Sequence, residues 1–328
     1  MWDVGVSGDD QVPHSIQKTV IGSFPCLEDR LEAAIERAID IQLGQELEIV
    51  SDGEQRADMI SYFEQIPGLV RDNKGLGIAE RIRPLDRVEG FHKLKDFSHA
   101  RSYLDRKGKK NVGLKVGITG PVTLGFTCAM NKLSGYRNVS DRDLYSDLAH
   151  TLRPLIDELL RLDAYVQLDE PGLSAGFMDP VQATVLINEM ISDLDYAKRG
   201  SGKLGIHVCG DLTRIPSLFN QLMKTDVDVV SLAFAGEAER RNLQLISEDA
   251  FAEHEKWLGL GCIPVTPLTI GSVSPVQDVV ELLNQGTKRV SPKRIAYVHP
   301  DCGLRNTPLD VAEEILERMR IAARTIQF

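Results

Sequence analysis

The stretch LYSDLAHTLRPLIDELLRLDAYVQL, residues 144–168, contains the two kinds of element from which we expect the whole chain to be built. Its first part, residues 144–162, places apolar side chains at the spacing of three and four that is typical of one face of a helix. Pro154 lies inside this pattern and predicts a kink or a break there. The second part, residues 164–168, is a short apolar run that ends at the polar sequence DEP, as a buried parallel strand would.

The same alternation of short apolar runs and helical patterns continues in both directions from this stretch. The runs that we interpret as strands are residues 19–21, 47–50, 114–118, 164–168, 204–208, 227–232, 257–261 and 295–298. Helical patterns lie between them, among others at residues 27–43, 180–198, 216–223, 276–285 and 308–323. Strands that alternate with helices predict a parallel sheet, and eight of them favour a closed (β/α)8 TIM barrel over an open sheet.

We expect one barrel domain over residues 17–328, preceded by a polar lead-in over residues 1–16. A chain of this length commonly forms one domain when it folds as an α/β barrel. Residues 67–111 depart from the alternation because they are charged and interrupted by glycines. They predict an insertion between the second and third strands, either a hairpin or partly helical.

The composition argues against several classes of partner. The net charge of −10 makes nucleic acid or an anionic membrane surface an improbable main partner. The sequence has no apolar stretch long enough to span a membrane, and its first residues lack the features of a secretory signal. The five cysteines are an odd number, which argues against a disulfide framework and favours a reducing compartment. We therefore expect a cytoplasmic protein with thiols that are free to bind a metal.

Polar motifs follow most of the predicted strands, at the end of the barrel where active sites of this fold form. His207 and Cys209 are two residues apart at one strand end, so their side chains project to the same side of an extended segment. Cys302 follows another strand and faces the same opening. One imidazole and two thiolates are a typical zinc set that leaves a fourth position for a substrate. The alternative is a buried core histidine with two unreactive cysteines.

A zinc ion bound by this set favours thiol chemistry. A free thiol is mostly protonated at neutral pH, whereas coordination to zinc removes the proton and leaves the sulfur reactive. Two thiolate ligands also donate charge to the metal and weaken its Lewis acidity. The sequence therefore predicts a site that activates a thiol substrate to attack a methyl group.

The strand-end motifs together resemble a known family. They are IGSFP (21–25), SDGEQRADMISYF (51–63), ITGPVTL (118–124), QLDEPGLSAG (167–176), HVCG (207–210) and HPDCGLR (299–305). In this order, over nearly the whole chain, they resemble the C-terminal catalytic barrel of cobalamin-independent methionine synthase. The short core form of that family, found in archaea and some anaerobic bacteria, is the most similar. The resemblance implies a zinc methyltransferase that methylates homocysteine to methionine.

The resemblance also implies a ligand set. His207, Cys209 and Cys302 match three of the family's zinc ligands. The fourth, a glutamate after the sixth strand, falls at Ala233 in this sequence, and alanine cannot bind a metal. Three alternatives follow: a site with three protein ligands plus water or thiol, a site that Glu237 completes, or a site that binds zinc weakly or not at all.

Three further residues match substrate contacts of the family. Asp169 matches the residue that holds the amino group of homocysteine, and Ser23 matches a contact to its carboxylate. Glu54 lies near the family's second acidic contact to the amino group, with a local spacing that differs by one. The alternatives are a salt bridge at the barrel tip for Asp169 and a helix or turn cap for Ser23.

The methyl donor is a second departure from the long form of the family, which takes its methyl group from a folate. That form has an extra N-terminal barrel and a histidine after the seventh strand that protonates the folate nitrogen. Residues 261–275, GCIPVTPLTIGSVSP, contain no histidine. Because a methyl–cobalt bond breaks without a proton, we expect methylcobalamin or another methylated corrinoid, on a corrinoid protein partner, as the donor. A different thiol acceptor such as coenzyme M, or a non-catalytic thiol-binding paralogue, remains an alternative.

Overall fold

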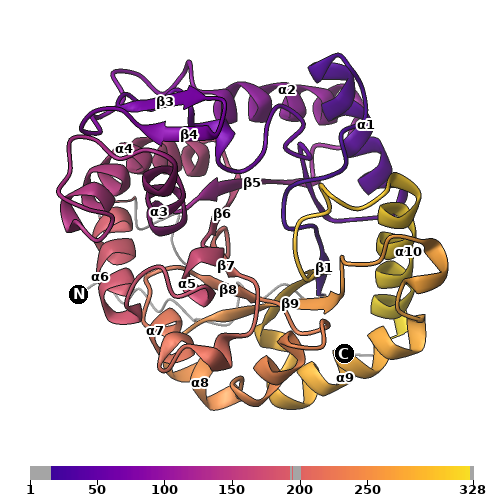
Figure 1. Ribbon diagram of the computed structural model, residues 1–328. Helices are drawn as coiled ribbons and strands as arrows, with labels where there is room; N and C mark the ends of the chain where they lie inside the picture. Colours follow the sequence, from indigo (N-terminus) through magenta and orange to yellow (C-terminus); the bar gives the residue numbers. More distant parts are fainter. Residues whose placement is uncertain (1–15, 193, 195–200, 326–328) are drawn as a thin grey trace, which may run out of the picture.

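The computed structural model describes residues 16–192, 194 and 201–325 of the chain. The strands of its main sheet follow the order β1 (Gln17–Lys18), β10 (Ile295–Pro300), β9 (Trp257–Ile263), β8 (Val229–Leu232), β7 (Leu204–Val208), β6 (Tyr165–Asp169), β5 (Gly113–Thr119) and β2 (Ile49–Ser51). All neighbours in this order pair in parallel. Figure 1 shows these strands around the centre and the helices in a ring outside them. The predicted TIM barrel is confirmed.

The seam of the barrel lies between β1 and β2, the two ends of the strand order. There the N–H of Phe24 donates to the carbonyl oxygen of Gly53 at 2.9 Å, so the loops after the two strands are joined. β1 begins two residues before the predicted run 19–21, although the N–H of Thr19 still donates to Val298 O at 3.0 Å. β1 and β2 each have a ladder on one side only, because they are the two ends of the strand order.

Helices cover the outer face of the barrel. They are α1 (Leu31–Gly44), α3 (Pro121–Asn131), α4 (Arg142–Arg161), α6 (Pro180–Ile191), α7 (Leu218–Met223), α8 (Glu248–Glu253), α9 (Val276–Arg289) and α10 (Leu309–Thr325). The helix predicted over residues 180–198 ends at Ile191, and residues 195–198 lie outside the described part. α4 runs unbroken through Pro154, so of the kink or break predicted there the break does not occur. Leu152 and Leu155 beside it are fully buried, and such burial offsets the lost backbone hydrogen bond.

The insertion predicted at residues 67–111 contains a hairpin and a helix. Strands β3 (Leu69–Asp72) and β4 (Gly75–Ile78) pair antiparallel, and α2 (His92–Arg106) follows them. α2 packs against α1 and β5, as a regular helix between the second and third barrel strands should. The hairpin is therefore the added part, and it packs on α3.

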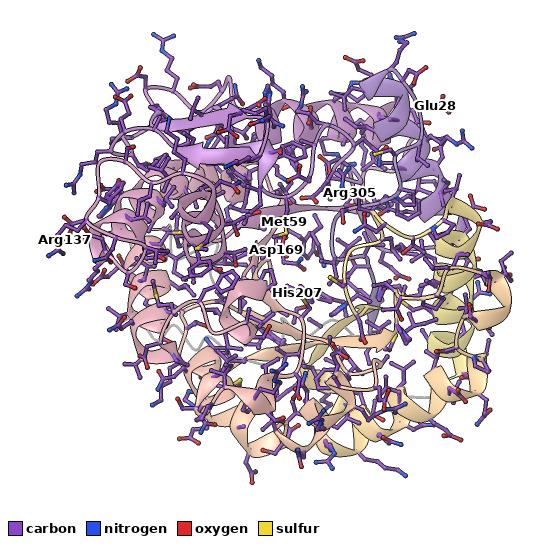
Figure 2. The ribbon with its side chains drawn as sticks, viewed as in Figure 1. Glu28, Met59, Arg137, Asp169, His207 and Arg305 are labelled. Atoms are coloured by element: carbon purple, nitrogen blue, oxygen red, sulfur yellow. The ribbon has the colours of Figure 1, made fainter. Side chains whose placement is uncertain are left out.

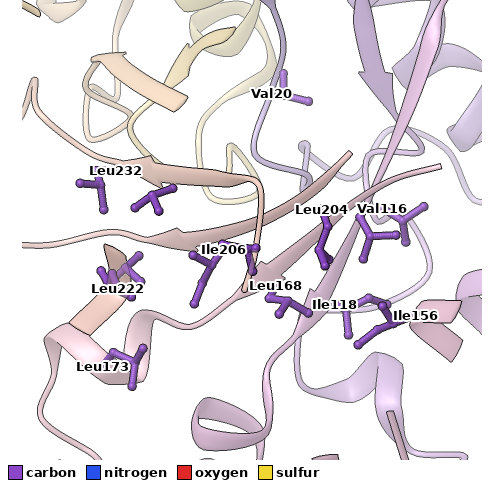
Figure 3. Close-up of a cluster of buried hydrophobic side chains, with 14 of the residues drawn as sticks. Val20, Val116, Ile118, Ile156, Leu168, Leu173, Leu204, Ile206, Leu222 and Leu232 are labelled. Atoms are coloured by element: carbon purple, nitrogen blue, oxygen red, sulfur yellow. The ribbon is translucent and has the colours of Figure 1, made fainter. Parts of the chain in front are cut away.

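The core between the strands and the outer helices determines which side chains face the barrel interior. Leu168 on β6 and Ile206 on β7 belong to the same apolar cluster as Leu222 on α7, and all three are buried (Figure 3). Because successive residues of a strand point to opposite faces, Asp169 and His207 then project into the barrel. The apolar alternation of these strands thus aims the polar residues at one opening.

Two further predictions concern the N-terminal residues and the location of the protein. The polar lead-in expected over residues 1–16 lies outside the described residues except for Ile16. Within the described ranges, no helix has both the length and the apolar character needed to cross a membrane. The cytoplasmic location stays a prediction.

Candidate metal centre

A cavity of about 270 Å³ opens at the end of the barrel where the strands end. Figure 2 shows Met59, Asp169, His207 and Arg305 near the middle of the ring, whereas Arg137 lies at its outside. All of the site residues that the sequence predicted line this cavity: Ser23, Glu54, Asp169, His207, Cys209 and Cys302. The strand ends of the fold therefore bring together side chains that are far apart in the chain.

His207, Cys209 and Cys302 place one nitrogen and two sulfur atoms within 4.8 Å of one another. His207 belongs to β7, Cys209 follows that strand, and Cys302 lies just beyond β10. The Nε2 atom of His207 is buried and has no hydrogen-bond partner among the described residues. A buried polar atom without a partner costs about 1–3 kcal/mol. The geometry is therefore unlike that of a core histidine with satisfied hydrogen bonds.

The other ring nitrogen of His207, Nδ1, is hydrogen-bonded on the side away from the metal-binding group. Its Nδ1 lies 3.0 Å from Ser231 Oγ, and that hydroxyl lies 2.9 Å from Nε2 of His299. His299 Nδ1 in turn lies 2.8 Å from the carbonyl oxygen of Pro300. Burial lowers the pKa of His299 well below its ordinary value, and the charges of His207 and Lys115 lower it further. His299 is therefore neutral at pH 7.

The two cysteines of the cluster influence each other. A hydrogen bond from Cys209 lowers the pKa of the Cys302 thiol well below its ordinary value, and contact with His207 adds to this effect against burial. The same hydrogen bond, together with burial, raises the pKa of Cys209. The two thiols are therefore coupled, and Cys302 loses its proton more readily than Cys209.

Glu54 and Asp169 place two carboxylates side by side above Gly117. A Cβ atom at Gly117 would lie 2.6 Å from Asp169 Oδ2 and 3.3 Å from Glu54 Oε1, so glycine leaves the room that they need. Burial raises the pKa of Asp169 well above its ordinary value, and the charge of Glu54 raises it further. A cation brought into the cavity, such as a substrate ammonium group, would relieve this repulsion.

The carboxylate of Asp169 is fixed from below by Gln167. Gln167 Nε2 donates to Asp169 Oδ1 at 2.8 Å and to Ile21 O at 2.9 Å. Its Oε1 accepts from Lys115 Nζ at 3.2 Å, and burial lowers the pKa of that lysine to about 7. Because both ends of the amide are engaged, Gln167 has one orientation, and so does the carboxylate that it holds.

The loops after β1, β2 and β10 meet at one wall of the cavity. A Cβ atom at Gly303 would lie 2.2 Å from Ser23 Oγ, so the Ser23 hydroxyl lies directly against the backbone of the last loop. Arg305 Nη2 donates to the carbonyl oxygens of Glu54 and Ala57. One guanidinium thus ties the loop after β10 to the loop that carries Glu54.

No fourth protein ligand joins the metal-binding group in the described residues. Ala233 is buried just after β8, and Glu237 lines a different cavity together with Arg240. The alternative in which Glu237 completes the site therefore has no support from the geometry. The fourth position is left to the cavity, where a substrate sulfur could reach it.

Sequence reasoning missed several residues that support the site. Gln167 had a signal, because it lies two residues before Asp169 on one strand and so faces the same side. Ser231 also had one, because it is the register neighbour of His207 on the adjacent strand. Lys93, whose Nζ lies 2.6 Å from Glu54 Oε1, had none. It comes from α2, on the outer layer, and only the complete fold brings it to Glu54.

The family model and similar curated proteins agree on one family. The family model described as the catalytic domain of cobalamin-independent synthase matches residues 15–325. A methionine synthase of Methanocaldococcus jannaschii is 29% identical, over 94% of this chain and 99% of the relative. One of Methanothermobacter thermautotrophicus is 30% identical, over 90% of each. A 5-methyltetrahydropteroyltriglutamate–homocysteine methyltransferase of Thermotoga maritima is 25% identical over 90% of this chain, which spans 40% of that relative.

Solved structures agree on the fold. A B12-independent methionine synthase from Shewanella sp. W3-18-1, in complex with selenomethionine, superposes with a TM-score of 0.72. It is 18% identical, and the match covers 94% of this chain and 97% of that one. A methyltransferase from Methanosarcina mazei gives a TM-score of 0.63 at 12% identity, with 95% and 94% covered. At these identities the likeness establishes the barrel and nothing finer.

The family overturns the prediction about the methyl donor. The family is described as cobalamin-independent, so the expected corrinoid donor is wrong. The predictions of methylcobalamin as cofactor and of a corrinoid protein as partner are wrong for the same reason. That expectation rested on the histidine missing from residues 261–275. A missing side chain excludes one proton donor, but it does not identify the molecule that carries the methyl group.

The predicted family and enzyme class are confirmed. The family model covers nearly the whole barrel, and relatives that match over at least nine-tenths of their length are methionine synthases. Five of the six motifs that carried the resemblance contribute residues to a single cavity in the structure, and ITGPVTL (118–124) is the exception. This chain belongs to the cobalamin-independent methionine synthase family and corresponds to its catalytic domain, a methyltransferase barrel.

Proposed function

We propose that this chain transfers a methyl group to the thiol sulfur of homocysteine and so forms methionine. The observation that carries the proposal is one cavity that holds both a thiol-binding group and an acidic pair. His207, Cys209 and Cys302 would receive the sulfur, while Glu54 and Asp169 would bind the amino group of the same molecule.

The donor atoms of the cluster fit zinc. One imidazole nitrogen and two cysteine sulfurs are ligands that Zn²⁺ prefers, and bonds of about 2.0–2.3 Å hold such ligands roughly 3.5–4 Å apart. A group whose atoms lie within 4.8 Å of one another can close to that spacing. The buried, unpartnered Nε2 of His207 supports the same assignment within the described residues. Zinc at this site would supply thiol activation, since a coordinated thiol loses its proton and its sulfur stays reactive.

The cavity residues would select the acceptor by its charged ends. Glu54 and Asp169 are suited to an ammonium group, because a positive charge relieves the repulsion between two buried carboxylates. The hydroxyl of Ser23, which lines the same cavity, can donate to a carboxylate. Coenzyme M has no amino group, and its sulfonate would face the acidic pair. The charges of the cavity therefore favour homocysteine over coenzyme M.

For the donor we propose a methylated tetrahydropteroyl compound, the class that appears in the names of the longer relatives. In the transfer, a bond forms between the methyl carbon and the acceptor sulfur, and the bond between that carbon and the donor nitrogen breaks. The electron pair stays on the nitrogen, which takes up one proton, while the acceptor thiol gives up one. Protons and charge therefore balance without an oxidant or reductant.

The test combines product formation with metal analysis. Purified protein is incubated with 5-methyltetrahydropteroyltriglutamate and either homocysteine or coenzyme M, and methylated products are measured by mass spectrometry. We expect methionine from homocysteine, little product from coenzyme M, and about one zinc per chain. Cys302→Ser should lose both the zinc and the methionine.

Cys26→Ser is the matched control, because Cys26 is an exposed thiol outside the metal-binding group, and a serine hydroxyl can still accept from Arg305 Nη1, which lies 3.3 Å from Cys26 Sγ. It should retain zinc and activity. Zinc retained in full by Cys302→Ser would contradict the assigned ligands. Preferred methylation of coenzyme M would contradict the assigned acceptor.

A further inference from the structure

The hydrogen atoms in the chain of contacts from His207 through Ser231 to His299 can be assigned from its far end. A carbonyl oxygen only accepts, so the 2.8 Å contact with Pro300 O requires a proton on His299 Nδ1. The His299 ring is fully buried against a carbonyl and a hydroxyl, where a charged imidazolium would be costly. Its Nε2 therefore carries a lone pair, which accepts the hydroxyl proton of Ser231 at 2.9 Å.

This assignment leaves one role for the Ser231 oxygen. Its single proton is used by His299, so toward His207 it can only accept. The 3.0 Å contact therefore places a proton on His207 Nδ1. A neutral imidazole protonated on Nδ1 has its lone pair on Nε2, the buried atom that has no partner in the described part of the chain. Two hydrogen bonds thus decide which nitrogen of His207 is available to a metal.

Ser231 and His299 lie on β8 and β10, and the strand between them makes room for their contact. In β9, Gly259 is the register neighbour of both Ser231 and Tyr297. A Cβ atom at Gly259 would lie 2.9 Å from Ser231 Cβ and 2.6 Å from the Tyr297 ring. Any side chain there would displace one of these neighbours. Glycine at this position therefore permits a hydrogen bond that spans two strands.

We propose that Ser231 and His299 are positioning residues that hold His207 in the tautomer whose Nε2 is free to bind a metal ion. The inference rests on the proposed zinc site. It adds that two hydrogen-bonded side chains give the histidine ligand the required tautomer before the metal binds. Neither residue needs to touch the substrate. Removing a support of this kind typically weakens metal binding by about 10–100-fold.

The tautomer can be observed in the metal-free protein by NMR of ¹⁵N-labelled histidine side chains. A pH of about 8.5 keeps the rings neutral, since the ordinary pKa of histidine is about 6.5. The signals of His207 are identified by their loss in a His207→Asn variant. Wild-type protein should carry the proton on Nδ1 alone, whereas Ser231→Ala should show both tautomers. A wild-type ring protonated on Nε2 with a bare Nδ1 would overturn the proposal, and this arm needs no Ser231 variant.

Zinc affinity, measured by competition with a chromophoric chelator, is the second readout. Ser231→Ala should bind zinc about 10–100-fold more weakly than the wild type. Ser98→Ala is the matched control, because Ser98 donates to Leu94 O at 2.8 Å on α2, away from the cavity. Its zinc affinity should equal that of the wild type. Equal affinity of Ser231→Ala and wild type would also overturn the proposal. If the wild type bound no zinc, the proposed function would be wrong. The tautomer of His207 in the metal-free protein would still test the present inference.

Discussion

The Nζ atom of Lys93 lies 2.6 Å from Oε1 of Glu54, and the two side chains are only 1% and 7% exposed. The same ammonium group lies 3.9 Å from the centre of the Tyr62 ring. Burial raises the pKa of Asp52 to about 6 and the pKa of Asp169 well above its ordinary value, and the charge of Lys93 opposes both shifts. One lysine from the outer helix layer therefore stabilises a group of three acidic side chains, two of which line the cavity.

Lys93→Met should destabilise the protein strongly. The change leaves the Glu54 carboxylate buried without its cation, and breaking a buried ion pair from one side typically costs about 3–5 kcal/mol. Urea unfolding would measure this loss. Arg83→Met is the control, because the Arg83–Glu80 pair is 64% and 61% exposed. The control should change stability by less than about 1 kcal/mol. Similar losses in the two variants would show that Lys93 does not compensate a buried charge.

Asp169→Asn should weaken recognition of the acceptor's amino group. An amide cannot supply the negative charge, and a hydrogen bond to a charged group contributes about 1.5–3 kcal/mol. We therefore expect kcat/KM for homocysteine to fall by about 10–100-fold. The comparison substrate is 4-mercaptobutanoate, which is homocysteine without the amino group. Its kcat/KM should change little in the variant, and an equal fall for both substrates would place the role of Asp169 elsewhere.

Much of this site could be predicted from the sequence because it is built at strand ends. The run 204–208 is a strand with those same bounds, so the directions of His207 and Cys209 followed from the alternation of a strand. Cys302 could be added because the barrel gathers all of its strand ends at one opening. The predictions of Ser23, Glu54 and Asp169 as substrate contacts came from the family resemblance, and the three residues line the same cavity in the structure.

What could not be predicted depends on contacts between layers or on an absent residue. Lys93 reaches Glu54 from α2, and no local pattern records that contact. Pro154 is accommodated because burial of its neighbours outweighs one lost hydrogen bond, a balance that spacing alone does not reveal. The donor was predicted wrongly because the prediction rested on an absent histidine, whereas the ligand set rested on residues that are present.

Arg305→Lys should raise KM for homocysteine by about 10-fold without removing zinc. Arg305 binds the carbonyl oxygens of Glu54 and Ala57, and Glu54 has a left-handed backbone with φ of 50°. Lysine cannot reproduce the fork of a guanidinium, so the loop that carries Glu54 should loosen. Steady-state kinetics and zinc content check this together. Arg137→Lys is the control, because Arg137 is 82% exposed and lies far outside the cavity (Figure 2). An unchanged KM in Arg305→Lys would contradict the role given to this contact.

Glu170→Gln should reduce the dependence of stability on pH. Glu170 is buried, and although it accepts hydrogen bonds from Val122 N, Thr123 N and Thr123 Oγ1, burial raises its pKa from 4.5 to about 7. Between these two values the folded protein binds more protons than the unfolded chain, so the free energy of unfolding falls as pH rises. This loss in the free energy of unfolding is absent below pH 4.5 and complete above about pH 7, where it reaches about 3 kcal/mol.

Urea unfolding at pH 5 and pH 8 would measure this effect in the wild type and in Glu170→Gln. The glutamine cannot ionise. Any stability that the variant loses through altered hydrogen bonds is therefore the same at both pH values and cancels in the comparison. The wild type should therefore lose up to about 3 kcal/mol more than the variant between the two pH values. Other buried acids, such as Asp301 with a pKa that burial raises to about 7, contribute equally to both proteins. An identical loss in both would mean that Glu170 keeps its charge in the folded state at pH 5, held by its three hydrogen-bond donors against the effect of burial.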